Sequence, residues 1–367
     1  MMKFVQSFLF FFKHIFIANK VDVLFYYPQH FNRGENGENL FFETLYESCK
    51  IHGKSFLVFE EPDFKTDKPR NNQAIPFDFI YLIIIILRKL FKSEMNIVVK
   101  GKKIGRFLSK TFLRGIKFKN YIVLSQSMLP IFSEVNPDSR LFDMQHGIIY
   151  SGKENYISKG VVSENLIKNN VNLLLNGNGF KAILEKSDSS DYFKNNAHII
   201  GVKTKPSFSH KLVNKNILVT LQFTEDHSKE QNKILLEELL EVVENNRTFT
   251  FFIRNHPRFN NEVDLSVLSS KTKLAPSLLS DCFKLCSIHL TSYSTTTFEC
   301  AEFGIPTVFL KSLENEFNIF KLDYKYPGND DIQSVFDNYK KHTEEVVLWK
   351  KQFYTAYDDK KFISLLK

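Results

Sequence analysis

The sequence predicts an α/β protein built from two doubly wound domains with parallel sheets. Strand and helix patterns alternate along most of the chain, and the alternation restarts after a Pro-, Lys- and Ser-rich interval from about Gly201 to Asn216. The 367 residues are enough for two cores of ordinary size. We therefore expect a hinge in that interval, a first domain over residues 1–205 and a second over 206–345.

Short apolar runs predict the strands of the first domain. They lie at residues 21–27, 55–61, 96–100, 120–126, 140–145, 171–177 and 197–201. The segment "ENLFFETLYESCKIHG", residues 38–53, has apolar residues at helical spacing and is expected to be a helix that Gly53 closes.

The second domain repeats this alternation in shorter form. Strands are expected at residues 216–223, 248–255, 288–292 and 306–310, and helices at 227–246, 274–286 and 294–304. Residues 344–366 have a helical pattern, but the sequence does not place the terminal segment 346–367 in either domain.

Composition limits the class of protein. Apolar residues make up 43% and charged residues 25%, which is typical of a globular chain. Four cysteines without metal-ligand spacing predict reduced thiols in a cytoplasmic protein. The net charge of +8 fits nucleic acid, anionic lipid or a phosphorylated substrate. Nucleic acid is the weakest of the three, because the basic stretch lacks interleaved aromatic residues on a recognisable module.

Two apolar segments raise the question of a membrane. Residues 1–20, "MMKFVQSFLFFFKHIFIANK", and 77–92, "FDFIYLIIIILRKLFK", are both too short to span a bilayer. With the basic stretch from Lys100 to Lys119, they predict peripheral contact with an anionic membrane, on its cytoplasmic face. Core helices beside a solvated basic face are the alternative, and both interpretations stay open.

Polar motifs at strand ends carry the functional prediction, because ligands of open parallel sheets gather beyond the carboxyl ends of the strands. In "RNHPRF", residues 254–259, Pro257 should stop the strand near His256, which Arg254 and Arg258 flank. The His256 imidazole could bond to a phosphate oxygen or protonate a leaving group. A histidine that only caps the strand end is the alternative.

A cluster of hydroxyls marks a second strand end, in "LTSYSTTTFECAEFGIP", residues 290–306. Free N–H groups at a helix start suit a phosphate, and hydroxyls add donors. One of these residues could be an ordinary N-cap, but five exceed what capping needs. The cluster comprises Ser292, Ser294, Thr295, Thr296 and Thr297, with Glu299 in the helix that follows.

The first domain offers two further loops. In "DMQHGIIYSGKENY", residues 143–156, Gly147 permits a sharp turn and His146 could act as base or phosphate ligand, or simply bond to a nearby carbonyl. The loop "FNRGENGENLFFE", residues 31–43, has two glycines, Gly34 and Gly37, and the carboxylate Glu38, but it lacks a GxGxxG fingerprint and is also explained as a turn. Two sheets facing across a cleft would bring all four motifs together.

With these motifs in place, the sequence resembles the GT-B glycosyltransferases. The similarity is to bacterial surface-polysaccharide enzymes: sialyl- and polysialyltransferases, Kdo-type capsule transferases and CDP-glycerol glycerophosphotransferases. "NHP" at 255–257 and "TSYSTTTFECAEFGIPTVF" match the family order in the C-terminal half, and "QHG" at 145–147 resembles an element of the N-terminal half. The resemblance implies two Rossmann-like domains facing across a cleft, the C-terminal one holding the donor.

The resemblance also implies roles for single residues. His256 would contact the phosphate of the leaving nucleotide, Ser294 and Thr295 would hold it, and Glu299 would bind the ribose. The implied donor-binding set is Arg254, His256, Pro257, Ser292, Ser294, Thr295, Thr296 and Glu299, and the implied acceptor-side set is Gly34, Gly37, Gln145 and Gly147.

The catalytic base is left open. The family's D/E-D/E-G motif is replaced by "TED" at 224–226, followed by His227, so the base could be Asp226, Glu225, His146 or Glu38. No convincing D-x-D motif is present, which predicts a transferase without a metal or other cofactor.

The predicted function is transfer of a sugar from a nucleotide-activated donor to a surface glycan or lipid-linked acceptor. A CMP- or CDP-linked donor is favoured, and a UDP-linked donor stays open. Such a sialyltransferase-like enzyme would serve capsule or lipopolysaccharide biosynthesis, and it would invert the anomeric centre without a metal. A GT-B-fold UDP-sugar 2-epimerase and a non-catalytic membrane-surface binding protein are the alternatives.

Overall fold

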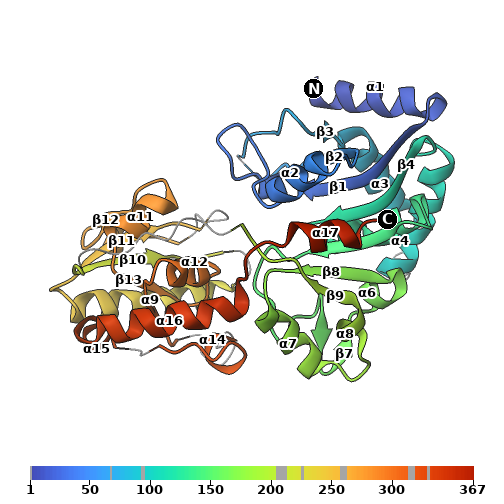
Figure 1. Cartoon of the computed structure of the whole chain (residues 1–367). Coiled ribbons are helices and arrows are strands. Elements are labelled where there is room, and N and C mark those ends of the chain that lie inside the picture. The colour runs from blue at the N-terminus through green and yellow to red at the C-terminus, as the bar shows by residue number, and fades with distance from the viewer. Residues whose placement is uncertain are drawn as a thin grey trace. The chain divides into compact units, whose positions relative to one another are not determined.

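The structure, a computed structural model, describes residues 2–66, 68–91, 96–203, 213–224, 227–256, 263–312, 319–328 and 331–367. The chain divides into two compact units, and Figure 1 labels their helices and strands. Unit 1 comprises Met1–Lys203 and Ala356–Lys367, and unit 2 comprises Thr204–Thr355. Most of the predicted hinge, residues 204–212, lies outside the described residues.

Unit 1 is built on a parallel seven-stranded sheet in the order β3-β2-β1-β4-β5-β8-β9. Its strands are β1 Asn19–Pro28, β2 Phe56–Glu61, β3 Ile75–Pro76, β4 Ile116–Val123, β5 Arg140–Met144, β8 Val171–Leu175 and β9 Ala197–Ile199. A small antiparallel pair, β6 Ile157–Ser158 and β7 Val161–Val162, stands apart from it.

Helices cover both faces of this sheet. Successive side chains of the central strand β1 point to opposite faces, and both sets are apolar and buried. Val23 and Phe25 of β1 pack with α2 and α17, and Tyr26 packs with Phe77 and Phe132 on the other face. The helices are α1 Met2–Phe16, α2 Glu43–Ile51, α3 Asp78–Leu90, α4 Ile97–Lys110, α5 Leu129–Val135, α6 Glu164–Asn169, α7 Asn178–Ser187, α8 Tyr192–Asn196 and α17 Asp359–Leu365, with single 3-10 turns at Gln29–Phe31 and Gln126–Met128.

Unit 2 contains a parallel five-stranded sheet in the order β12-β11-β10-β13-β14. Leu218 of β10 packs against α11 and α12, whereas its neighbours Ile217 and Val219 pack against α9 and α15. The strands are β10 Asn216–Thr220, β11 Thr250–Arg254, β12 Lys273–Leu274, β13 Ile288–Thr291 and β14 Thr307–Phe309. The helices are α9 Lys229–Asn245, α10 Ser266–Ser269, α11 Leu279–Leu285, α12 Thr296–Glu302, α14 Ile319–Leu322, α15 Ile332–Asp337 and α16 Tyr339–Phe353.

One predicted strand is wrong. Residues 96–100 begin helix α4, whose buried side includes Val98, Ile104 and Leu108 at helical spacing. The Asn96 side chain accepts a hydrogen bond from the Val98 N–H at 2.8 Å and so caps the helix. A five-residue β-branched run cannot be distinguished from the first turn of a helix by period alone.

Three helix boundaries also differ from expectation. The helix predicted over 38–53 begins only at Glu43 and ends at Ile51. The helix predicted over 274–286 begins only at Leu279, since Leu274 ends strand β12 and Pro276 follows it. The C-terminal pattern divides into α16 and α17, with the break between residues 353 and 359. The boundary predicted at residue 345 falls within α16, which belongs to unit 2, whereas α17 returns to unit 1.

The four cysteines, Cys49, Cys282, Cys286 and Cys300, are buried free thiols. Burial raises the pKa of the Cys49 and Cys286 thiols to about 12, so both stay protonated at neutral pH. In the part of the chain that the structure describes, no helix combines the length and the apolar character needed to cross a bilayer.

Candidate functional site

The strand order in the parallel sheet of unit 2 reverses between β10 and β13. From the central strand β10, the next two strands in sequence, β11 and β12, extend the sheet on one side, and β13 and β14 extend it on the other. In doubly wound sheets, such a switch point is where the loops after neighbouring strands part and a ligand fits. The paired residues Thr220 and Arg254 end β10 and β11, and Thr291 ends β13 beside them, so three strand ends form one edge.

Hydroxyls gather at this edge. Thr291 Oγ1 donates to the Thr220 carbonyl oxygen at 3.1 Å, and the Thr296 N–H donates to Ser294 Oγ at 3.2 Å. Among the described residues, Ser292 Oγ and Thr297 Oγ1 are buried without a hydrogen-bond partner. Buried hydroxyls rarely remain unsatisfied, so these two are candidates to bind a ligand. Helix α12 has only seven residues, so its dipole is small. We therefore assign anion binding at this edge to the hydroxyl side chains and not to the helix dipole.

A histidine that the sequence analysis did not single out lies in the same place. His227 Nε2 is 2.6 Å from the Tyr293 hydroxyl, and His227 Nδ1 is 3.2 Å from Asn232 Oδ1. The side chain therefore joins the loop after β10 to helix α9 and to the loop after β13. The only sequence signal was its position, directly after "TED" at the end of a predicted strand.

A second histidine, within strand β13, holds hydroxyls of the neighbouring strands β10 and β14 in place. His289 of β13 lies between two hydroxyls, with Nε2 2.9 Å from Thr220 Oγ1 and Nδ1 3.0 Å from Thr307 Oγ1. Complete burial lowers the pKa of His289 to about 3, so the ring is neutral. Because it is fully buried within the sheet, His289 positions its neighbours and does not contact a ligand.

His256 and Arg254 belong to the same edge. Arg254 Nη1 donates to the Pro276 and Ser277 carbonyl oxygens at 2.9 and 2.8 Å, which holds the segment before α11 against β11. His256 is half-buried two residues beyond β11. Strand β10 lies between β11 and β13, so about 10 Å separates the two outer backbones. Pro257, Glu225 and Asp226 lie outside the described residues.

The remaining predicted donor residues surround the start of α12. Thr295 is the residue before the helix, and its carbonyl oxygen accepts from the Phe298 N–H at 3.0 Å. Thr296 and Glu299 are both half-buried within the first turn. The structure thus places Ser292, Ser294 and Thr295–Glu299 in one short segment, as their order in the sequence requires.

In unit 1, the loop after β5 carries His146 in an apolar and cationic setting. His146 Nδ1 lies 3.2 Å from the Met144 carbonyl oxygen, and its ring packs on Phe31 at 4.8 Å between centroids. Burial lowers the pKa of His146 to about 4, and the nearby cations Lys153 and His30 act in the same direction. The ring is therefore neutral at pH 7, with Nδ1 donating and Nε2 left as the acceptor.

Gln145 and Gly147 shape this loop. Gln145 is buried, accepts from the Asn176 N–H at 3.0 Å and donates to the Gly147 carbonyl oxygen at 3.2 Å. A Cβ at Gly147 would meet only Lys153 Nζ, at 4.0 Å, so the glycine is not needed for close packing within the chain. Gln145 thus ties the loops after β5 and β8 together.

The glycine loop after β1 is held by its own side chains. Glu38 accepts from the Asn36 N–H at 3.0 Å, a bond that closes the turn. Hydrogen bonds from its own backbone N–H and from the Asn36 side chain hold the pKa of Glu38 below its usual value. Gly37 has φ +84°, and a Cβ there would come within 2.6 Å of the Pro69 carbonyl oxygen. Gly34 faces Glu38 just as closely. The backbone of segment 69–70 explains Gly37, and the Glu38 side chain explains Gly34, without a ligand.

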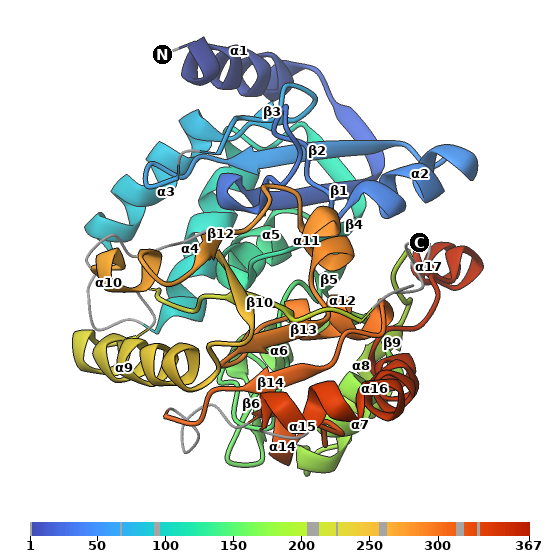
Figure 2. The ribbon, with the colours of Figure 1, turned by 90° about the vertical axis from the view of Figure 1, so that its left-hand side faces the viewer.

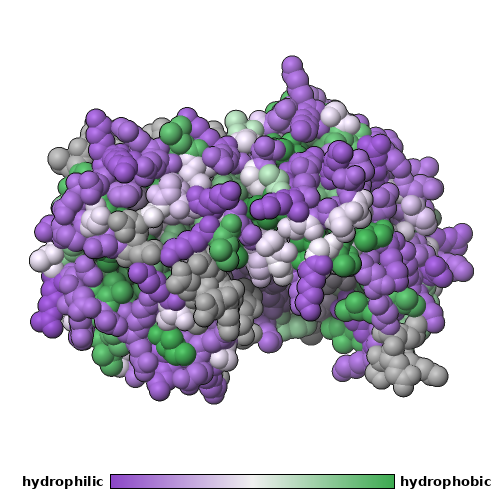
Figure 3. Space-filling model, turned by 90° about the horizontal axis from the view of Figure 1, so that it is seen from below, coloured by the Kyte–Doolittle hydropathy of each residue, from purple (hydrophilic) through white to green (hydrophobic). Residues whose placement is uncertain are grey.

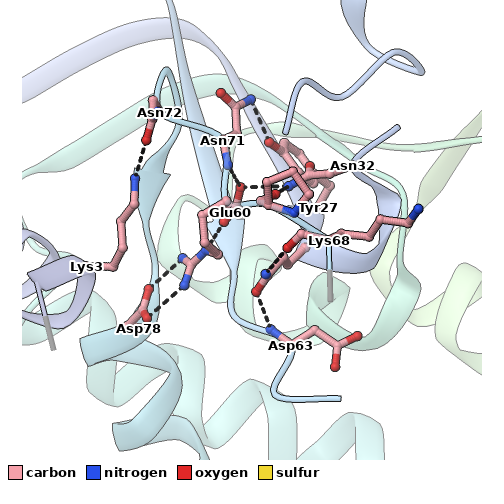
Figure 4. Close-up of polar contacts among 12 residues, drawn as sticks. Lys3, Tyr27, Asn32, Glu60, Asp63, Lys68, Asn71, Asn72 and Asp78 are labelled. Atoms are coloured by element: carbon pink, nitrogen blue, oxygen red, sulfur yellow. Dashed lines mark hydrogen bonds and ion pairs between the residues drawn. The ribbon is translucent and has the colours of Figure 1, made fainter. Parts of the chain in front are cut away.

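A buried polar network fixes this loop to the sheet (Figure 4). Glu60 of β2 is 1% exposed, and it accepts from the Asn71 N–H at 2.7 Å and from Asn32 Nδ2 at 3.2 Å. Arg70 pairs with Glu60 and forms two bonds of 3.0 and 2.8 Å to Asp78. These contacts join the segment 68–71 to β2, α3 and the loop after β1 (Figure 4).

Asp143 is a further ionisable group at the carboxyl end of β5. Gln126 Nε2 donates to Asp143 Oδ2 at 2.7 Å, whereas Asp143 Oδ1 is buried without a partner among the described residues. Burial raises the pKa of Asp143 to about 7, against the opposing influence of Gln126, Tyr156 and Lys153. The sequence gives no sign of this, because the shift depends on what packs around the carboxyl.

We expect Asp143→Asn to become more stable relative to the wild type as pH rises from about 4 to about 7. The folded chain keeps the Asp143 proton over this interval while the unfolded chain loses it near pH 4, so wild-type stability falls by about 1.4 kcal/mol per unit of pKa difference. Urea unfolding at several pH values measures the difference between variant and wild type.

Asp22→Asn is the matched control. The hydrogen bond from Lys119 lowers the pKa of Asp22 to about 2, so its carboxylate contributes stability that is complete above pH 4 and is lost toward pH 2. Its difference from the wild type should stay constant between pH 4 and 7. A constant difference for Asp143→Asn over the same interval would contradict the raised pKa.

Across the described ranges, no group of three or more His, Cys, Asp or Glu side chains is placed to hold a metal ion. The described residues at the edge of unit 2 offer hydroxyls, imidazoles and backbone N–H groups. Such donors suit a phosphate, whose oxygens accept hydrogen bonds.

Comparisons with known proteins agree on the fold. No protein-family model matches the sequence, and a search of curated proteins finds no relative. Among solved structures, the wall teichoic acid polymerase TagF has a TM-score of 0.53 at 12% identity, over 100% of this chain and 96% of that chain. UDP-GlcNAc 2-epimerase from Neisseria meningitidis, bound to UDP-GlcNAc, has a TM-score of 0.50 at 12% identity, over 94% and 96%.

These neighbours are GT-B enzymes, and the chain has the same fold: two Rossmann-like units, each with a parallel sheet. The identities are too low to show more than the fold. The likeness therefore does not select among the sialyl-, Kdo- and glycerophosphotransferases that the sequence motifs resemble.

Proposed function

We propose that the chain is a glycosyltransferase of the GT-B type, which moves a sugar from a nucleotide-activated donor to a surface glycan or lipid-linked acceptor. The observation that carries the proposal is the edge of unit 2, where Ser292 and Thr297 bring buried, unpartnered hydroxyls to the switch point of the sheet. TagF, to which the chain is similar, was also studied with CDPG, in keeping with a cytidine nucleotide donor.

In this proposal the nucleotide phosphate lies on the Ser/Thr segment and His256 lies beside it. The acceptor oxygen attacks the anomeric carbon, the bond from that carbon to the phosphate oxygen breaks, and the acceptor proton passes to a base. His256 stabilises or protonates the departing phosphate. A single displacement of this kind inverts the anomeric centre and needs no metal.

The base is one of the four candidates of the sequence analysis. Two of them, His146 and Glu38, are described. The neutral His146 ring can accept a proton, but a pKa of about 4 makes it a weak base, and the Glu38 carboxylate is engaged by Asn36. These properties do not single out His146 or Glu38 as the base, so the proposal keeps all four candidates, with Asp226 and Glu225.

A panel of CMP, CDP, UDP and GDP tests the proposal by thermal shift. We expect a pyrimidine nucleotide to bind, and a ligand at a hundred times its Kd adds about 2.7 kcal/mol to stability. The double variant Ser292→Ala/Thr297→Val should unfold no more easily than the wild type, because it removes only unpartnered hydroxyls. It should bind the nucleotide at least about tenfold more weakly, the loss of about one good hydrogen bond.

Thr343→Val is the matched control in the same unit. Thr343 Oγ1 donates to the Gly304 carbonyl oxygen at 2.8 Å, so this variant should lose stability and keep nucleotide affinity. Unchanged affinity in the Ser292/Thr297 variant would remove the hydroxyls from the site. Failure of the wild type to bind any of the four nucleotides would favour a non-catalytic binding protein.

A UDP-sugar 2-epimerase is the second candidate, because the Neisseria enzyme shares the fold at a comparable TM-score. An epimerase converts its nucleotide sugar without any acceptor. Incubation with UDP-GlcNAc alone, followed by NMR of the sugar ring, separates the two: an epimer supports the second candidate, and an unchanged donor supports the transferase.

A further inference from the structure

Helix α1 is fixed to unit 1 by one narrow face. Phe11 is fully buried against Phe59 and Phe77, with ring centroids 5.3 and 5.5 Å away. Ser7 Oγ accepts from the Phe79 N–H at 3.1 Å and so satisfies a backbone donor in the first turn of α3. These contacts make α1 an ordered part of the unit.

The opposite face of α1 is apolar and exposed. Its residues recur every three or four positions and form one stripe along the helix. They are between 47% and 75% exposed: Met2, Val5, Leu9, Phe12 and Phe16. In Figures 1 and 2, none of the other described elements of unit 1 covers the outer side of α1.

Helix α3 continues this apolar surface. Phe79 of α3 contacts Phe4 and Phe8 of α1, with centroids 5.9 and 5.1 Å apart, so the two helices pack side by side. Along α3, the exposed residues Leu82, Ile86 and Leu90 follow Phe79 on one helical face and are 45%, 49% and 73% exposed. In contrast, Figure 3 shows a face on which hydrophobic residues occur in small groups among hydrophilic ones.

The charges around this surface are positive. Helix α1 contains no acidic residue, and exposed Lys13 lies at its C-terminal end. The only carboxylate of α3, Asp78, is paired with Arg70, whereas Lys89 in the last turn is exposed. Helix α4, which contacts α3, has five basic residues and no acidic one. Lys102 and Arg106 pair with Glu134 of α5, which leaves Lys100, Lys103 and Lys110 as further basic residues of this helix.

From these observations we propose that the outer face of α1 and α3 docks on a lipid bilayer with anionic headgroups. An amphipathic helix lying in the interface buries its apolar stripe among the acyl chains and leaves its cations at the headgroups. The same cations would repel each other if two copies of this face met, so charge favours the bilayer over a second chain. This docking does not depend on the proposed catalytic activity.

Vesicle flotation of the full chain tests the proposal. The wild type should bind vesicles that contain about one third phosphatidylglycerol, and bind pure phosphatidylcholine more weakly, with added salt reducing the difference. Leu9→Glu/Phe16→Glu should weaken binding at least about tenfold, because it places two carboxylates in the apolar stripe. Ile51→Glu, at a residue of unit 1 exposed as much as Phe16, should bind like the wild type.

Thermal unfolding and nucleotide binding of all variants serve as the fold control, since neither property involves this face. Vesicle binding that Leu9→Glu/Phe16→Glu leaves unchanged would overturn the proposal, as would a wild type that binds neither composition. If light scattering instead showed a dimer that the same double variant dissociates, without vesicle binding, a second copy of the chain would be the occupant.

Discussion

We expect His256→Ala to lower sugar transfer by about 10²-fold or more while the fold stays intact. His256 follows β11 at the edge of unit 2, next to the loop after β10 and two strands from the hydroxyl segment. A positioned general acid contributes about 10²–10⁴-fold. Initial rates with a CDP- or CMP-linked donor measure the loss, and circular dichroism checks the fold.

A second variant, with a control in unit 1, separates the possible roles of His256. His256→Gln keeps a hydrogen-bond donor without a titrating group, so it should restore part of the rate if the imidazole only holds the phosphate. If protonation is required, His256→Gln should be as slow as His256→Ala, and both should lose the alkaline limb of the pH–rate profile, where a general acid gives up its proton. His52→Ala, in unit 1, removes a contact of 2.5 Å to Asp359 and should leave the rate unchanged. Near-normal transfer by His256→Ala would exclude both roles.

We expect Arg70→Met to cost about 3–5 kcal/mol of the stability of unit 1, because it leaves Glu60 as a buried charge without its cation. Arg70 also joins Asp78 of α3 to the segment that packs on the loop after β1. Adding Glu60→Gln should recover part of the loss, since the double variant has no buried charge to compensate.

Unfolding must be followed by a probe of unit 1. The single tryptophan, Trp349, lies in α16 of unit 2, so its fluorescence reports on the other unit. Calorimetry, or exchange of the β1 and β2 amides, serves instead. Arg106→Met is the control: it removes the exposed pair with Glu134 and should change little. A loss no larger than this control for Arg70→Met would contradict the role of the network.

Much of the fold could be predicted from periodicity. The run at 21–27 and residues 216–220 of the run at 216–223 are buried central strands with apolar side chains on both faces, and long periodic segments such as 229–245 are helices. Failures came where local pattern is ambiguous, as at 96–100, or where a boundary depends on tertiary contacts, as in the division between α16 and α17.

The candidate site was predictable only in part. Order along the chain was enough to place Ser292, Thr297 and His256 at strand ends, because in parallel sheets those ends share an edge. The contacts of His227 with Tyr293, of Asp143 with Gln126 and of Glu60 with Arg70 were not predictable. Each joins residues from different loops, and its strength depends on burial that no local pattern reveals.

Amide hydrogen exchange of the full chain, with and without a saturating pyrimidine nucleotide, tests most directly where that ligand binds. Protection should appear in the segments after β10, β11 and β13, near Thr220, Arg254 and Ser292–Thr297. A bound nucleotide that protected only amides of unit 1, or left the Ser292–Thr297 segment unprotected, would show that the edge of unit 2 is not its site.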